Sequence, residues 1–226
     1  DPKNSKHKMS LKEIVNHISK KESLLIFLYE KRENYFSLAG AQDKIPVIYY
    51  RRSLYLPAKN LPTTHILKPP AKHLSMPEDS VYNEYFCMKL AKRVNLNVPN
   101  VEIIGDKVPF YLIERFDRSK INGEIKRLHQ QDFCQALGIS SFKKYEAGGG
   151  PSLVDCYNLI KEKSKFSTKD LGRFLDILIF NLIIGNNDAH SKNFSFLLTD
   201  KGIQLSPFYD LVCTHIYKEF SQNFSF

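Results

Sequence analysis

The feature that most constrains the fold is the run Leu171–Ile184, which is apolar on nearly every side of a helix. A surface helix carries its apolar side chains along a single stripe, so a helix that is apolar all round is expected in the centre of a core. The polar segment Gly185–Asn193 follows this run without a break. We therefore expect a central helix that delivers a polar loop to the edge of the core.

The rest of the chain divides into two halves with different hydrophobic patterns. Up to residue 113, short runs rich in β-branched and aromatic residues predict strands, with a helix at each of two places among them. The expected strands are 45–50, 54–56, 64–68, 101–104 and 110–113, and the expected helices are 11–29 and about 79–93. From about Asp132, helical spacing predominates, and the expected elements are helices at 133–137, 153–160 and 171–184 and a hairpin over 194–208.

This change of pattern predicts an α+β protein with two lobes. Residues 1–116 form the β-rich N-lobe and residues 117–226 the helical C-lobe, and a cleft between two lobes is a common place for a ligand. The glycine run before Pro151 is expected to be a flexible loop.

Composition narrows the class of protein without choosing a function. The 226 residues carry 33 Lys and Arg against 24 Asp and Glu, so the net charge of +9 suits a phosphate-rich ligand or an acidic partner. The four cysteines show no CxxC spacing, which makes zinc or a disulfide framework unexpected and fits a reducing cytoplasm. No apolar run approaches the ~18 residues of a membrane span, and the polar start lacks a signal-peptide core.

Three polar residues near the end of the chain form a pattern that phosphoryl transfer requires. Asp188 and Asn193 lie five residues apart in the loop after the apolar helix, and Asp210 follows the next hairpin. One carboxylate can accept the proton of an attacking hydroxyl, while an amide and a second carboxylate can hold Mg²⁺. Protein kinases use the same Asp-x-x-x-x-Asn spacing with a later metal-binding Asp. The alternative is a capped helix end, where Asn and Asp are also common.

The β-rich half offers groups for a nucleotide. Lys68 ends a strand, as does the lysine that neutralises nucleotide phosphates in kinases, and Glu84 on the following helix is a candidate partner for it. Residues 37–44 are mostly small and precede a strand, so their backbone N–H groups can approach phosphates, although one glycine does not make a standard Gly-rich loop. The alternatives are a solvated strand end for Lys68 and a solvated helix face for Glu84.

Together these segments resemble the HipA family of Ser/Thr kinases, the toxins of bacterial toxin–antitoxin systems. The matching segments, in the order of the family, are SLAGAQDK (37–44), HILKP (65–69), NEYFC (83–87), IERFDR (113–118), RLHQQDFCQALG (127–138), GNNDAHSKN (185–193) and SPFYDL (206–211). The resemblance implies a bilobal protein-kinase-like fold that uses ATP and Mg²⁺ to phosphorylate a protein, in characterised members an aminoacyl-tRNA synthetase.

The resemblance also implies roles for individual residues. Asp188 matches the catalytic base, and Asn193 and Asp210 match the Mg²⁺ ligands. The positions that it assigns to nucleotide binding are Gly40, Gln42, Lys44, Lys68, the hinge residues Glu114 and Phe116, His190, Asn193 and Asp210. Ser37 matches the serine that becomes autophosphorylated, and its phosphate is expected to remodel the loop and block ATP. Ala39 stands where some members carry a second serine, so single-site control is expected.

Two departures from the long family members concern the ends of the chain. Only 36 residues precede Ser37, which resembles the compact HipT type, whose missing subdomain is supplied by the small protein HipS alongside the DNA-binding HipB. The chain also stops 16 residues after Asp210, where the family continues into further helices, so we expect the C-lobe to be incomplete. Antitoxin partners resembling HipS and HipB are therefore expected, with DNA contacted only through a partner.

Two other functions stay open from the sequence. One is a small-molecule phosphotransferase of the aminoglycoside-kinase type, although such enzymes usually carry His two residues before the aspartate, where this chain has Asn186. The other is a non-catalytic module of a DNA-bound antitoxin complex that uses the positive charge. Three intact residues, Asp188, Asn193 and Asp210, favour catalysis over a silent module, and no DNA-binding motif is evident in the sequence.

Overall fold

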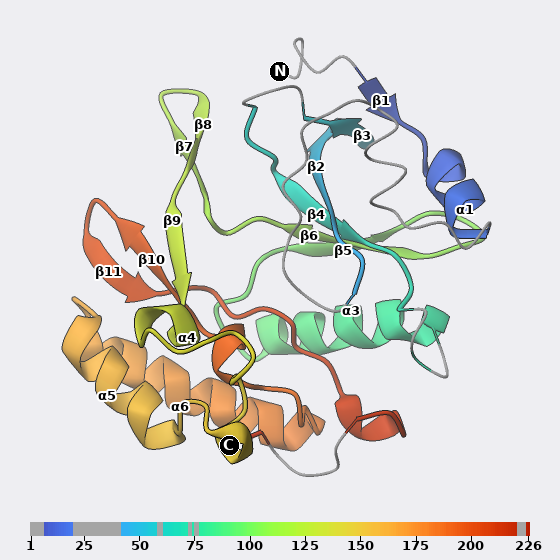
Figure 1. The fold of residues 1–226 in the computed structure, drawn as a ribbon. Helices are drawn as coiled ribbons and strands as arrows, with labels where there is room; N and C mark the ends of the chain where they lie inside the picture. The colour runs from blue at the N-terminus through green and yellow to red at the C-terminus, as the bar shows by residue number, and fades with distance from the viewer. Residues whose placement is uncertain (1–6, 20–41, 58–60, 72–73, 75–76, 221–224) are drawn as a thin grey trace. The chain divides into compact units, whose positions relative to one another are not determined.

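The chain forms two compact units (Figure 1). The computed structural model describes residues 7–19, 42–57, 61–71, 74, 77–220 and 225–226. The first unit comprises Asp1–Tyr82 and Asn100–Arg115, and the second comprises Asn83–Pro99 and Phe116–Phe226. Helix α3 (Pro77–Arg93) therefore begins in the first unit and ends in the second.

The first unit is built on a six-stranded antiparallel sheet. Its strands are β1 (His7–Met9), β2 (Ile45–Tyr50), β3 (Ser53–Leu56), β4 (His65–Lys68), β5 (Val101–Ile104) and β6 (Phe110–Glu114). They lie in the order β1-β3-β2-β4-β6-β5. Helix α1 (Leu11–Ser19) follows β1, so the first nine residues of the predicted helix 11–29 are confirmed, and residues 20–29 lie outside the described part.

The core of this unit follows from the two-residue period of its strands. Apolar side chains two positions apart lie on the same face of a strand, and several strands contribute such pairs. The buried cluster consists of Met9, Ile14, Ile45, Val47, Leu54, Leu56, Leu67, Phe110 and Leu112. Arg51 and Arg52 turn the predicted β2–β3 hairpin with φ of 48° and 57°, the left-handed backbone that a two-residue type I′ turn needs.

The second unit combines helices with two small sheets. Its helices are the rest of α3, α4 (Phe133–Ala136), α5 (Leu153–Lys163) and α6 (Ser167–Ile184), with 3₁₀ turns η1 (Glu146–Gly148), η2 (Ser191–Asn193) and η3 (Thr214–Ile216). Its strands are β7 (Arg118–Ile121), β8 (Glu124–Arg127), β9 (His129–Asp132), β10 (Ser195–Thr199) and β11 (Gly202–Leu205). β7 and β8 form a hairpin, and the other three strands form a sheet in the order β11-β10-β9.

Aromatic packing ties this sheet to the helices. Phe133, the first residue of α4, is fully buried, and its ring lies 5.0–6.2 Å from the rings of Phe174 on α6, Phe194 just before β10, and Phe196 on β10. Large aromatic side chains in such tilted contacts contribute strongly to a core. The contact fixes the start of β10 against α6, and so fixes both ends of the loop that joins them.

The expectation that α6 is buried on all sides is wrong for the part of the chain that the structure describes. Phe174, Ile177 and Phe180 are buried, but Leu182 and Ile183 are 60% and 76% exposed. The hydrophobic pattern correctly predicted the helix. It did not show that the residues described in the structure bury only one side of this helix.

The glycine run before Pro151 forms a hydrogen-bonded turn, and the flexibility expected from its sequence stays a prediction. The N–H groups of Gly148 and Gly150 both donate to the carbonyl of Tyr145, at 3.1 and 2.9 Å. Gly149 has a φ of +77°, a left-handed conformation that glycine adopts at little cost. Three successive glycines therefore fold the chain back on the Lys144–Tyr145 segment.

Within the described ranges, no helix has both the length and the apolarity that a membrane crossing requires.

Candidate active site

The end of α6 sets the position of the polar loop. Gly185 ends the helix in the left-handed region, with φ of 69°, and a Cβ there would lie 3.0 Å from the Cβ of His215. Asn181, the one amide in the last two turns of the helix, is buried, and its Oδ1 accepts a 2.9 Å hydrogen bond from Nδ2 of Asn186. Oδ1 of Asn186 in turn accepts from the backbone N–H of Asp188 at 3.3 Å. A chain of amides thus holds the backbone of Asp188 against the helix end.

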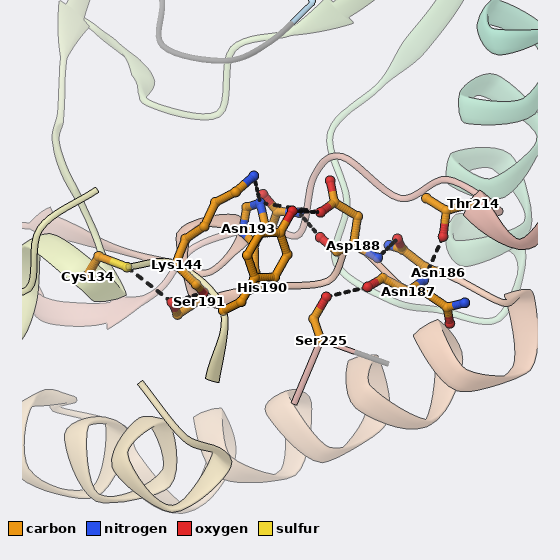
Figure 2. A network of polar contacts seen from close by, with 11 residues as sticks. Cys134, Lys144, Asn186, Asn187, Asp188, His190, Ser191, Asn193, Thr214 and Ser225 are labelled. Atoms are coloured by element: carbon orange, nitrogen blue, oxygen red, sulfur yellow. Dashed lines mark hydrogen bonds and ion pairs between the residues drawn. The ribbon is translucent and has the colours of Figure 1, made fainter. Parts of the chain in front are cut away.

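Asp188 lies at the centre of a polar network (Figure 2). Nδ2 of Asn193 donates to the backbone carbonyl of Asp188 at 3.0 Å, which brings the two residues of the predicted Asp-x-x-x-x-Asn pair together. The hydroxyl of Tyr145 donates to Oδ1 of Asp188 at 2.5 Å, and Nε2 of His190 lies 3.8 Å from the same oxygen. The side chain of Asp188 is 26% exposed, so the carboxylate remains accessible.

His190 is a neutral member of this network at neutral pH. Burial lowers its pKa to about 4, although the charge of Asp188 opposes the shift and that of Lys144 adds to it. Nζ of Lys144 lies 2.9 Å from Nε2 of His190, and an ammonium can only donate, so Nε2 accepts and the ring proton resides on Nδ1. Lys144 therefore places a positive charge beside Nε2 of His190, which itself lies 3.8 Å from the carboxylate of Asp188.

Asp210 follows strand β11 through a segment that α6 holds in place. Arg173 on α6 donates to the carbonyls of Leu205 and Ser206 at 2.9 and 2.8 Å, and it pairs with the buried carboxylate of Asp170 at 2.9 Å. Asp210 itself has a φ of 54°. A left-handed backbone at a residue with a Cβ costs about 1–2 kcal/mol, so the surrounding structure forces this conformation.

Asn193 and Asp210 line the same small hollow in the second unit. The remaining lining is mostly apolar, and it also includes Asn181 and Asn186. Among the described residues no group of three or more His, Cys, Asp and Glu side chains is arranged to hold a metal alone. One carboxylate and one amide oxygen are nevertheless a donor set that Mg²⁺ accepts when phosphate oxygens and water complete its coordination, so these residues fit the predicted metal.

The first unit holds Lys68 in a buried position. Lys68 is 4% exposed and lies opposite Tyr111 in the register of β4 and β6. Its ammonium lies 5.5 Å from the centre of the Tyr111 ring. Nε2 of Gln42 donates to the carbonyl of Pro69 at 2.8 Å, which places this predicted nucleotide residue beside the end of β4. A buried lysine is expensive unless its charge is compensated, so the solvated strand end is not what the structure shows. Lys44 lies just before β2 and is half-buried.

The other predicted site residues fall in different places. Glu114 is exposed at the end of β6, where its carboxylate accepts from Nδ2 of Asn100 at 2.7 Å. Phe116 belongs to the second unit and stacks on Tyr209, the neighbour of Asp210, at 5.3 Å. Glu84 is buried on α3, in the second unit, so it is not on a solvated face, and its pairing with Lys68 stays a prediction. Ser37 and Gly40 lie outside the described residues.

The sequence missed residues that complete the site. Lys144 and Tyr145 reach the loop from 43 or more positions upstream, and their only sequence signal is the glycine run that follows them. Thr214 was missed as well, although its hydroxyl accepts from the N–H of Asn187 at 2.7 Å. Asn181 carried a usable signal, because a single amide inside an apolar helix is expected to be bonded to something.

Comparison with known proteins shows the family to which a chain with this fold and this loop belongs. Residues 36–226 match the HipA-like C-terminal domain family. The chain is 37% identical over 199 residues to the Serine/threonine-protein kinase toxin HipA of Shewanella oneidensis, and 43% identical over 187 residues to Y4mE of Sinorhizobium fredii; each match covers 82% of the chain. The chain therefore belongs to the HipA-like C-terminal domain family.

Solved structures agree with this assignment. The Shewanella oneidensis toxin–antitoxin complex of HipA, HipB and operator DNA matches 97% of the chain with a TM-score of 0.77 and 32% identity. The Helicobacter pylori kinase CtkA matches 78% of the chain with a TM-score of 0.56 and 20% identity, a likeness of fold alone. The mixed α and β fold that the sequence predicted is thus confirmed. The chain spans 44% of Y4mE, 45% of the HipA relative and 53% of the HipA chain in the complex.

Proposed function

We propose that this chain is the catalytic part of an ATP-dependent Ser/Thr protein kinase. The observation that carries the proposal is the arrangement around Asp188: an accessible carboxylate whose backbone is bonded to Asn193, beside a hollow that Asn193 shares with Asp210. The name of the HipA relative, a serine/threonine-protein kinase toxin, supports the same activity. The match to the HipA chain supports the bilobal, kinase-like arrangement. The proposed nucleotide-binding N-lobe is 1–116 and the proposed catalytic C-lobe is 117–226, whereas the compact units of the structure place Asn83–Pro99 and Phe116 with the second unit.

The roles of the residues follow from their chemistry. Asp188 accepts the proton of a serine or threonine hydroxyl while that oxygen bonds to the γ-phosphorus of ATP and the bond to ADP breaks. Asn193 and Asp210 would hold Mg²⁺, which neutralises charge on the phosphate oxygens when bound. The buried ammonium of Lys68 compensates further phosphate charge, and Gln42, Lys44 and Gly40 lie in or next to the segment that covers the phosphates. Glu114 and Phe116 supply the backbone hinge for adenine.

The physiological role belongs to the same proposal. The relatives in a toxin–antitoxin system support a kinase toxin, and its antitoxins would resemble HipS and HipB, the HipT-type arrangement, with DNA reached through the partner. The substrate class is a protein, an aminoacyl-tRNA synthetase by the resemblance. Autophosphorylation of Ser37 would add about −1.5 to −2 charges where ATP phosphates bind, and so would inactivate the kinase.

The direct test is phosphate transfer from MgATP by the purified chain. The phosphoproteome of cells that express the wild type is compared with that of cells expressing Asp188→Asn, and a dominant phosphoprotein that requires Asp188 names the substrate. Asp210→Asn is expected to abolish transfer as well and to leave the fold intact. Wild-type transfer by a folded Asp188→Asn protein would refute the assignment of the base.

Intact-mass measurement after incubation with MgATP tests the Ser37 switch. One added phosphate is expected, and it should be absent from both Ser37→Ala and Asp188→Asn. An unmodified wild type that labels its substrate at full rate would remove the switch and leave the kinase assignment standing.

A further inference from the structure

The segment that carries Lys144 and Tyr145 is built to reach the catalytic loop. The hydroxyl of Ser191 donates to the carbonyl of Lys144 at 2.9 Å, which joins the segment to the turn η2 just after His190. On the other side, Gly150 has no room for a side chain, because a Cβ would lie 2.5 Å from the carbonyl oxygen of Lys143 and 2.7 Å from that of Tyr145. The position of Tyr145 is therefore fixed from both sides.

Contacts within the network fix the orientation of the Tyr145 ring. The ring meets His190 edge-on at 5.2 Å, with an interplanar angle of 82°. The ammonium of Lys144 lies 4.7 Å from the centre of the same ring, a distance at which a cation is attracted to the aromatic face. Only the hydroxyl of Tyr145 reaches Asp188, so its ring contacts and its hydrogen bond can be separated by substitution.

The two oxygens of the Asp188 carboxylate have different surroundings. Oδ1 accepts the 2.5 Å hydrogen bond from Tyr145 and lies nearest to His190. Oδ2 accepts no hydrogen bond from any residue that the structure describes, and the side chain is partly exposed. A carboxylate held through one oxygen has its rotation about χ2 restricted and its other oxygen aimed in one direction, which is the preorganisation that a general base needs.

We propose that Tyr145 is a positioning residue of the kinase: its hydroxyl holds Oδ1 of Asp188 so that Oδ2 receives the proton of the substrate hydroxyl. This inference rests on the proposed function, since it requires Asp188 to be the base. Tyr145 acts through Asp188 and does not itself take part in phosphate transfer. Burial, together with the hydrogen bond and the charge of Asp188, raises the pKa of Tyr145, so the phenol keeps its proton and acts as a donor.

The matched variants are Tyr145→Phe, which removes only the hydroxyl, and Tyr157→Phe, which removes an exposed hydroxyl on α5. ADP release from MgATP is measured with dephosphorylated casein as the acceptor probe. The proteins compared are the wild type, the single variants Tyr145→Phe, Tyr157→Phe and Asp188→Asn, and the double variant Asp188→Asn/Tyr145→Phe. We expect Tyr145→Phe to lower kcat roughly tenfold with an unchanged KM for ATP. In the Asp188→Asn background, we expect Tyr145→Phe to cause no further loss of the residual ADP release. Tyr157→Phe is expected to release ADP at the wild-type rate.

A second measurement reads the contact without any turnover. The tyrosines are labelled with ¹³C at Cζ, and the NMR resonance that Tyr145→Phe removes is assigned to Tyr145. Asp188→Asn is expected to shift this resonance and to leave that of Tyr157 in place. An unmoved Tyr145 resonance would overturn the inference even if the chain releases no ADP.

Two kinetic results and one chemical result would also overturn the inference. Wild-type kcat in Tyr145→Phe beside an inactive Asp188→Asn would remove Tyr145 and keep the proposed base. A faster Tyr145→Phe would show that the phenol competes with the substrate for Asp188. Phosphate found on Tyr145 itself would make it an acceptor. Full activity of Asp188→Asn would instead refute the proposed function, which separates the two failures.

Discussion

At the scale of single residues, the site depends on positions that have no chemistry of their own. Gly150 is the clearest case, because any side chain there would collide with two carbonyl oxygens of the segment that carries Tyr145. Gly148, two positions earlier, has open space where a Cβ would lie, and its φ is not in the left-handed region. The pair provides the same substitution in two different environments.

We predict that Gly150→Ala displaces Tyr145 and lowers phosphate transfer by roughly the tenfold expected for Tyr145→Phe, since both lose the same hydrogen bond. Gly148→Ala should transfer phosphate within about twofold of the wild type, because nothing crowds its methyl group. ADP release and the ¹³C resonance of Tyr145 measure the two effects. Equal behaviour of the two variants would show that the tight turn does not position Tyr145.

His190 makes the stability of the protein depend on pH in a defined direction. Its pKa of about 4 lies below the ordinary 6.5, because burial disfavours the charged ring. As the pH falls below 6.5, the unfolded chain therefore takes up this proton before the folded chain does, and the contribution of His190 is progressively lost down to about pH 4. We predict a loss of about 1–2 kcal/mol from this group between pH 7 and pH 5.

Urea unfolding at both pH values measures the effect, as the difference between the wild type and His190→Gln. His129→Gln, which alters an exposed histidine on β9, is the control and should keep the wild-type dependence. A wild-type pH dependence in His190→Gln would contradict the prediction.

The proximity of Asp188 and Asn193 could be predicted from the sequence, because the two residues lie only five positions apart along the chain, while their catalytic and metal-binding roles stay predictions. Asp188 and Asn193 are joined by the loop that bonds them. Tyr145 could not be found in this way, because it meets Asp188 only after α5 and α6 have folded back over the intervening residues. The glycine run that follows Lys144 and Tyr145 is their only local signal, and it is too common on protein surfaces to mark a functional site.

At the scale of elements, hydrophobic period predicted strands and helices well where one face is buried. The β2–β3 hairpin and β4 were found in this way, as were β5, β6 and α3. Strands β7, β8 and β9 were missed, because their residues are mostly polar, half of them are exposed and none is buried, so no alternation shows in the sequence. Their pairing depends on backbone hydrogen bonds to neighbours that the local sequence does not reveal.

Helix α6 shows the opposite error, and it provides a test. Ile177 is fully buried, while Ile179, two positions later, is 47% exposed. Replacing either by alanine gains the same helix propensity, so the difference between the two variants reports burial alone. We predict that Ile177→Ala lowers the free energy of unfolding by about 2–4 kcal/mol and Ile179→Ala by less than about 1 kcal/mol.

Urea or thermal unfolding of the 226-residue chain measures both free energies. If Ile179→Ala costs as much as Ile177→Ala, the outer side of α6 is covered in solution, and the first expectation of a helix buried on all sides would be restored.

At the scale of the whole molecule, the proposed kinase needs both units for one ligand. Lys68 belongs to the first unit, and Asn193 and Asp210 belong to the second. Each unit has its own structural reason for these positions: sheet register places Lys68 opposite Tyr111, and the Arg173 contacts hold the segment before Asp210. A net charge of +9 favours a polyanionic ligand in general, but it does not connect these groups.

Nucleotide binding can show whether Lys68 and Asp210 act on the same molecule. Lys68→Met keeps the aliphatic stem and removes the charge, so we predict roughly tenfold weaker binding of a fluorescent ATP analogue, about 1.4 kcal/mol. Asp210→Asn should remove most of the gain in affinity that Mg²⁺ provides. If one nucleotide contacts both residues, the double variant will deviate from additivity by about 0.5–3 kcal/mol, because distant and independent sites add. Lys107→Met, an exposed lysine of the first unit, controls for the loss of charge and should bind like the wild type. Strict additivity of Lys68→Met and Asp210→Asn would mean that the two units do not hold one nucleotide, and the kinase proposal would then lack its N-lobe.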